Sequence, residues 1–117
     1  MSKTPIDRYD EIKREIIQIS EIYTLIKQNR ANIENGMKQV KELNSVVRYE
    51  QRHMLLLYMR LSDLIKELNS MNAAQEITIS LLYKNAVNSL KSNLLENCGA
   101  EYQIEISTDI KLNQCLF

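Results

Sequence analysis

Few residues in this sequence could do chemistry. One histidine, His53, follows Glu50 at helical spacing, and two cysteines, Cys98 and Cys115, stand far along the chain. Covalent catalysis would need a nucleophile and a base brought together, and a zinc site would need close ligand pairs that this spacing does not provide. We therefore interpret His53 as a surface or interface histidine, and we expect no catalytic residue, no cofactor and no metal site.

Motifs that position substrates are also missing from the sequence. It contains no glycine-rich phosphate loop, no zinc-protease helix motif and no nucleophile elbow, and it has only 2 glycines. Carboxylate pairs such as Asp7 with Glu11 have basic neighbours within a turn, which is typical of solvated helix faces; Asp63 with Glu67 is a second such pair. We expect a protein that is not an enzyme and takes no small-molecule substrate.

Length, net charge and cysteine content place the chain in a broad class of proteins. Its 117 residues suffice for one core, and its net charge of zero resembles neither a nucleic-acid arm nor an acidic tail. Two cysteines are too few for a disulfide framework; buried or free thiols are the favoured interpretation, and a short disulfide is the alternative. No stretch approaches the ~20 apolar residues that span a bilayer, and the first residues lack the apolar core of a signal peptide. We expect an intracellular, soluble chain.

A heptad of apolar residues is the strongest pattern in the chain, and it predicts a continuous seam on helical structure. A seam of this length needs a partner, either the chain folded back on itself or another chain. Asn35-Gly36 is a turn signal within it. Either one helix runs from residue 5 to about 70, or the chain reverses near 29–38 and its halves pair; we favour the reversal. The seam comprises Ile12, Ile19, Ile26, Ile33, Val40, Val47, Met54, Leu61 and Leu68.

Capping signals predict the helix boundaries. Thr4 is a suitable N-cap, Pro5 suits the first helical position, and Asp7 completes a capping box. Asn72 followed by Gln75 resembles a second box and predicts the start of a third helix. One face of that helix would carry Ile79, Tyr83, Ala86, Leu90 and Leu94 before it ends near Gly99.

After residue 99 the period changes. Tyr102, Ile104 and Ile106 alternate with polar residues, which predicts a short strand or hairpin that must dock on a helix or a partner. We therefore divide the chain into a helical domain, 1–99, and a short C-terminal β element, 100–117. The candidate core and interface residues are Ile12, Ile19, Ile26, Ile33, Val40, Val47, Met54, Leu57, Tyr58, Arg60, Leu61, Leu64, Leu68, Leu90, Leu94, Ile104 and Ile106.

Polar residues interrupt the apolar pattern. Arg30, Asn44 and Gln51 fall at the a positions of the same heptad repeat, where they would set the register of a coiled coil or, as we favour, rotate out to solvent. Arg48 and Arg52 belong to a basic stripe that we assign to protein salt bridges or solvation rather than to phosphate contact. Nucleic-acid contact is expected only indirectly.

The segment from Arg48 to Leu61 resembles the central helix of GINS subunits, which form a four-chain complex that joins the replicative helicase in eukaryotes. Tyr58, Arg60 and Leu61 carry the likeness, and Thr4-Pro5 resembles the family's proline-led helix. The resemblance is to the partner-of-Sld-five subunit one and Sld-five branch, in a shortened and divergent form. It implies a nuclear, non-catalytic helical domain packed against sister subunits.

These patterns predict a mainly α protein, an elongated helical bundle or coiled coil of two to three long helices with a short C-terminal β-hairpin or strand. The expected role is a scaffold or interaction subunit of an obligate multiprotein complex, with other protein subunits as partners, hetero-oligomeric in preference to homo-oligomeric. The alternatives are a coiled-coil tether or self-associating structural protein, of the vesicle-tethering or kinetochore type, and a nucleic-acid-binding helical module. Localisation would be nuclear if the GINS resemblance holds and cytoplasmic otherwise.

Overall fold

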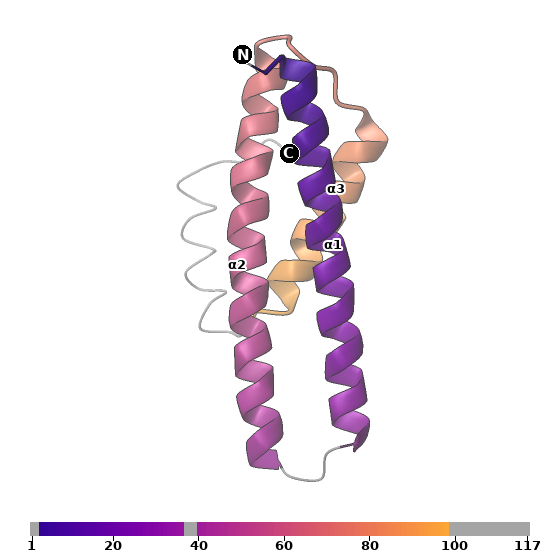
Figure 1. Ribbon diagram of the computed structural model, residues 1–117, viewed down its shortest axis with the longest axis vertical. Coiled ribbons are helices and arrows are strands. Elements are labelled where there is room, and N and C mark those ends of the chain that lie inside the picture. Colours follow the sequence, from indigo (N-terminus) through magenta and orange to yellow (C-terminus); the bar gives the residue numbers. More distant parts are fainter. Residues whose placement is uncertain (1–2, 37–39, 99–117) are drawn as a thin grey trace.

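The computed structural model describes residues 3–36 and 40–98, and the side chains of these residues except 33–36 and 40–44. These parts of the chain form helices α1 (Pro5–Gly36), α2 (Val40–Ala73) and α3 (Leu81–Glu96). α1 and α2 lie side by side and antiparallel, and α3 lies along one half of the pair (Figure 1). The predicted helical bundle is confirmed, and the single continuous rod is wrong because α2 returns along α1.

α1 begins where the sequence predicts. The Asp7 backbone N–H donates to Thr4 Oγ1 at 3.1 Å, and the Thr4 N–H donates to Asp7 Oδ2 at 3.4 Å. This reciprocal pair satisfies backbone donors that have no partner inside the helix. The capping box is therefore confirmed, with Pro5 at the first helical position.

The predicted start of the third helix near Asn72 is wrong, because α2 ends at Ala73 and α3 begins only at Leu81. Gln75 has a φ of 62°, and its N–H donates to the Asn72 carbonyl at 3.1 Å. The Glu76 N–H donates to the Met71 carbonyl at 3.0 Å. Together these are the two hydrogen bonds of a Schellman motif, which ends a helix. The Asn72–Gln75 spacing thus marks a C-terminus.

The N-cap of α3 is instead Ser80, whose Oγ accepts the Tyr83 N–H at 3.2 Å. The residues between the helices are not simply a surface loop, since Ile77 and Ile79 are buried. Ile79, expected on the third helix, therefore anchors the connection, and Val87 takes the buried place expected for Ala86, which is exposed.

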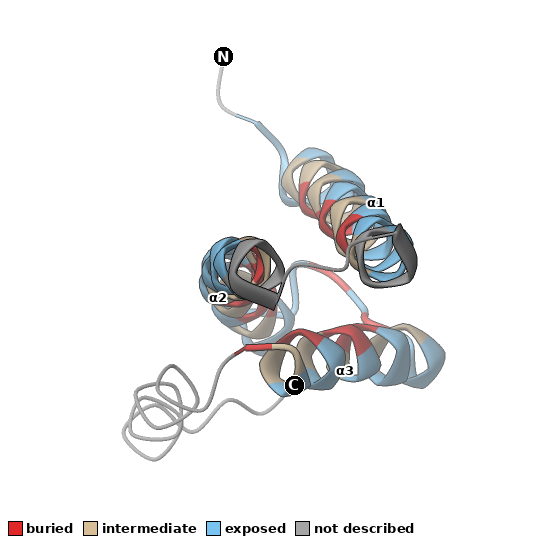
Figure 2. Ribbon diagram, turned by 90° about the horizontal axis from the view of Figure 1, so that it is seen from below, coloured by how far each residue is buried: buried red, intermediate tan, exposed pale blue. Residues whose placement is uncertain are grey.

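One apolar core joins all three helices, and the buried sides of the helices face one another in Figure 2. Its members are Ile12, Ile16, Ile19, Ile26, Met54, Leu57, Tyr58, Leu61, Leu64, Ile65, Leu68, Met71, Ile77, Ile79, Val87, Leu90, Leu94 and Cys98. α3 has 16 residues against 32 in α1 and 34 in α2, so it covers only part of the hairpin. The expected β element, 100–117, lies outside the described residues and stays a prediction.

Leu61 tests the core directly, since it is fully buried while Leu25 on α1 is 57% exposed. We expect Leu61→Ala to lower the free energy of unfolding by about 2–5 kcal/mol, the range for core leucines. Leu25→Ala should change it by less than about 0.5 kcal/mol, as for surface positions. Urea denaturation followed by circular dichroism measures both, and equal effects would contradict this core.

Candidate functional site

The residues that could do chemistry do not converge. Glu50 is buried and accepts a hydrogen bond from Arg30, while the half-buried His53 ring lies 6.4 Å from the Tyr49 ring, centroid to centroid. Cys98 is buried at the end of α3, where its Sγ donates to the Leu94 carbonyl at 3.2 Å. Burial raises the pKa of the Cys98 thiol, which disfavours the nucleophilic thiolate. Cys115 lies outside the described residues.

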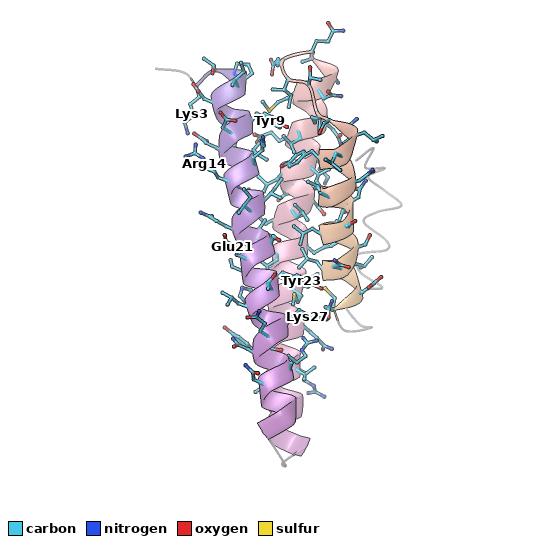
Figure 3. The ribbon with its side chains drawn as sticks, turned by 90° about the vertical axis from the view of Figure 1, so that its right-hand side faces the viewer. Lys3, Tyr9, Arg14, Glu21, Tyr23 and Lys27 are labelled. Atoms are coloured by element: carbon cyan, nitrogen blue, oxygen red, sulfur yellow. The ribbon has the colours of Figure 1, made fainter. Side chains whose placement is uncertain are left out.

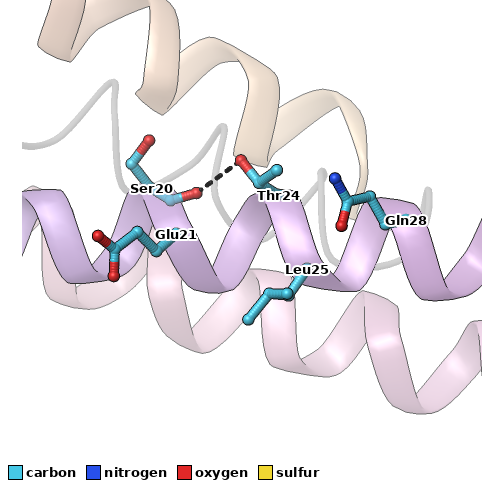
Figure 4. A pocket seen from close by; sticks show the side chains of 5 residues that line it. All are labelled: Ser20, Glu21, Thr24, Leu25 and Gln28. Atoms are coloured by element: carbon cyan, nitrogen blue, oxygen red, sulfur yellow. Dashed lines mark hydrogen bonds between the residues drawn. The ribbon is translucent and has the colours of Figure 1, made fainter.

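A shallow, open hollow lies on α1, with a volume of about 430 Å³. Figure 4 shows that its described lining comes from one helix, with Thr24 Oγ1 donating to the Ser20 carbonyl at 3.0 Å. In the described part of the chain, no residue from a second helix lines this hollow. Among the described residues no three His, Cys, Asp or Glu side chains gather as metal ligands, and none of the described helices is both long and apolar enough to cross a membrane.

Ion pairs align α1 with α2. The Arg8 guanidinium donates to both carboxylate oxygens of Glu67, and Arg60 donates in the same way to Glu15. These hydrogen bonds hold the pKa of Glu67 and of Glu15 below its ordinary value and raise the pKa of each arginine. Both pairs are partly exposed, so each contributes modestly to stability.

A third pair lies near the end of the hairpin that α3 does not reach. Arg30 Nε donates to Glu50 Oε2 at 2.8 Å, and the two side chains are only 17% and 8% exposed. Arg30 Nη2 is buried and has no hydrogen-bond partner among the described residues. The expectation that Arg30 turns to solvent is wrong, because its guanidinium lies between the helices. Gln51 is half-buried, and the Asn44 side chain lies outside the described residues.

α3 is held to α1 by aromatic and amide contacts. The Tyr9 and Tyr83 rings meet edge to face at 6.2 Å, and Lys13 Nζ lies over both, at 5.1 and 5.7 Å. Asn97 Nδ2 donates to the Tyr23 hydroxyl at 3.2 Å. Desolvation raises the pKa of Tyr83 to about 12, so the ring stays neutral. In Figure 3, Tyr9 and Tyr23 lie on the side of α1 toward α3, whereas Glu21 points away.

The outer face of α2 is the candidate functional site. It is the side of α2 directed away from α1 and α3 (Figure 2). Large apolar side chains lie on it, with Tyr49 73%, Leu56 56% and Met59 50% exposed. Its residues follow a heptad of their own and are all exposed: Ser45, Tyr49, Arg52, Leu56, Met59, Asp63, Lys66 and Ser70.

The structure places most of the candidate core and interface residues inside the chain. Buried members are Ile12, Ile19, Ile26, Met54, Leu57, Tyr58, Leu61, Leu64, Leu68, Leu90 and Leu94. Val47 is half-buried, and Arg60 is exposed and paired with Glu15. The side chains of Ile33 and Val40 lie outside those described, as do Ile104 and Ile106. The described α1 part of the seam is therefore covered by α2 and α3, so the chain folded back on itself supplies the partner there.

Sequence reasoning missed the interhelical charges. Asp63/Glu67 was assigned to a solvated face beside Lys66, but Glu67 pairs with Arg8 on α1. The sequence held a signal for these pairs. Arg8 faces Glu67, and Glu15, seven residues after Arg8, faces Arg60, seven residues before Glu67. The outer heptad of α2 was missed as well, because only Tyr49, Leu56 and Met59 among its residues are large and apolar.

Comparison with known proteins supplies no relative. No protein-family model matches the chain, and neither a curated protein nor a solved structure shows significant similarity to it.

The Arg30–Glu50 pair predicts an asymmetric response to substitution. Glu50→Leu leaves the Arg30 guanidinium unpaired, and we expect a loss of about 2–4 kcal/mol, since breaking a fully buried pair costs about 3–5 kcal/mol. The double variant Arg30→Met/Glu50→Leu should recover most of this loss in urea denaturation. A double variant as unstable as the single one would show that the arginine is not held there by its charge.

Acid should weaken the α1–α2 contact. Because the pKa values of Glu15 and Glu67 are lowered from 4.5 in the folded chain, their stabilisation is present above that value and is lost as pH falls through the folded pKa. Glu67→Gln should reduce the fall in melting temperature between pH 7 and acid. Glu21→Gln, on an exposed α1 position, is the matched control. Equal falls in both variants would contradict this origin.

Proposed function

We propose that the chain is a non-enzymatic helical interaction module that binds another polypeptide helix through the outer face of α2. The observation that carries this is the two-sided character of α2. Its inner side supplies core residues such as Leu61 and Leu68, while the opposite side exposes Tyr49, Leu56 and Met59 at heptad spacing.

Spacing separates this face from ordinary surface residues. Single exposed apolar side chains are normal on any protein, and Ile17 and Leu25 on α1 are examples. On α2 the apolar residues instead recur at the i, i+7 and i+10 positions of one stripe. That pattern is how helices recognise a partner helix or a groove.

The resemblance to GINS subunits is compatible with this role and adds a process to the proposal. It implies a helical domain packed against sister subunits of a replication complex. In the structure the residues that carry the likeness serve the chain itself, since Tyr58 and Leu61 are buried and Arg60 pairs with Glu15. The partner surface of the module is therefore a different part of the same helix.

Leu56 and Ile17 form a matched pair for the test, because each is 56% exposed. In tagged chain isolated from its native cells, we expect Leu56→Asp to release the bound polypeptide and Ile17→Asp to retain it, with equal melting temperatures. A charge on the apolar stripe must be desolvated on binding, which is unfavourable. Light scattering and quantitative mass spectrometry measure the assembly. Assemblies unchanged by Leu56→Asp, or a chain that is monomeric throughout, would contradict the proposed function.

A further inference from the structure

We infer that the partner helix at the outer face of α2 is the same helix of a second copy, docked antiparallel about a two-fold axis that passes midway between positions 57 and 58. This inference rests on the proposed function and names the partner for it. The face is self-complementary in charge, and that property selects both the partner and its direction.

We call each pair of facing residues from the two copies a layer, and the layers nearest the two-fold axis are apolar. In an antiparallel helix pair, a position on one helix faces the position equally far from the axis on the other. Leu56 of one copy then faces Met59 of the other, and the symmetry repeats the contact. Both side chains are at least half exposed in the single chain, so the pairing removes apolar surface from water.

The next layers carry opposite charges. In the layers next farther from the axis, Arg52 of one copy faces Asp63 of the other, and the symmetry repeats this contact. Both residues are exposed, and neither forms an ion pair with another described residue. The pairing therefore uses exposed charges outside the ion pairs between the helices, and Asp63 also attracts Arg60 on its own helix.

The outer layers continue the match. Tyr49 of one copy faces Lys66 of the other, which allows an ammonium to lie over an aromatic ring. Ser45 faces Ser70 beyond them, so all eight positions of the heptad find partners over 26 residues of helix, about 39 Å at 1.5 Å per residue.

A parallel arrangement fails on the same residues. It would place Arg52 against Arg52, Asp63 against Asp63 and Lys66 against Lys66, and like charges at an interface are unfavourable. A different partner would need its own complementary charges, whereas a second copy supplies them without further assumption. The observations thus favour a second copy over the distinct subunit expected from the sequence.

Charge exchange at one layer tests this arrangement. Arg52→Asp and Asp63→Arg each place like charges in both symmetric layers. We expect each variant alone to raise the dimer dissociation constant at least about tenfold, since two attractive pairs become repulsive. Mixed together, the two variants should associate with one another, because the mixed dimer has an opposite-charge pair in both layers. The double variant Arg52→Asp/Asp63→Arg should dimerise like the native chain.

Sedimentation equilibrium of the full chain over a range of concentrations measures these constants, and circular dichroism confirms that each variant is folded. Arg14→Asp, at an exposed position of α1, is the matched control and should leave dimerisation unchanged. Native association that survives both single variants, or single variants that do not associate when mixed, would overturn the second-copy arrangement.

The outcomes separate this inference from the proposed function. A chain that stays monomeric alone but binds a different polypeptide, lost with Leu56→Asp, overturns the second copy and leaves the proposed function standing. A monomer whose melting temperature falls with Leu56→Asp overturns both, because the face is then covered by the chain itself.

Discussion

The length of α3 constrains how the rest of the chain can be built. With 16 residues it covers roughly half of a hairpin whose helices have 32 and 34. Where three helices meet, the facing positions are apolar and fully buried, as at Ile12 and Leu64. Where α3 is absent, two helices alone enclose little volume, and the seam position is taken by Arg30 with its partner Glu50. A guanidinium is acceptable there because the Glu50 carboxylate pairs with it and 17% of the Arg30 side chain remains exposed.

The charges between α1 and α2 supply what an apolar seam lacks, a unique register. Isoleucines and leucines repeated every seven residues would pack almost as well after a shift of one heptad. A shift in one direction would bring Arg8 against Arg60, and a shift in the other would bring Glu15 against Glu67, so either shift loses two attractive pairs and adds a repulsive one. Each native pair adds little stability because it is partly exposed. The free-energy difference between the native and the shifted register is larger, because it includes both the lost attraction and the new repulsion.

The elements that could be predicted from sequence are those whose signals are local or strictly periodic. The capping box at Thr4 and the buried seam through Ile12, Ile19 and Leu61 are examples. The α2 terminus could not be placed, since Asn72 and Gln75 satisfy the residue preferences of an N-cap, and only the left-handed conformation of Gln75 shows that they end a helix. The direction of the Arg30 side chain could not be predicted for a different reason. A polar residue at a seam position turns inward only if a partner such as Glu50 lies opposite, which depends on the register of two helices.

The inner seam and the outer face of α2 differ in composition. The difference suits folding on the inner side and association with a partner on the outer side. The inner seam is continuous and apolar, so burying it drives folding and cannot be undone without unfolding. The outer heptad has apolar side chains only at its centre and at Tyr49, with Arg52, Asp63 and Lys66 between and beyond them. Those charges remain hydrated when the face is open, and they must be desolvated when it closes, so part of the attraction is cancelled. A helix built this way folds through one face and associates reversibly through the other, and the charge order on the second face decides which partner is accepted.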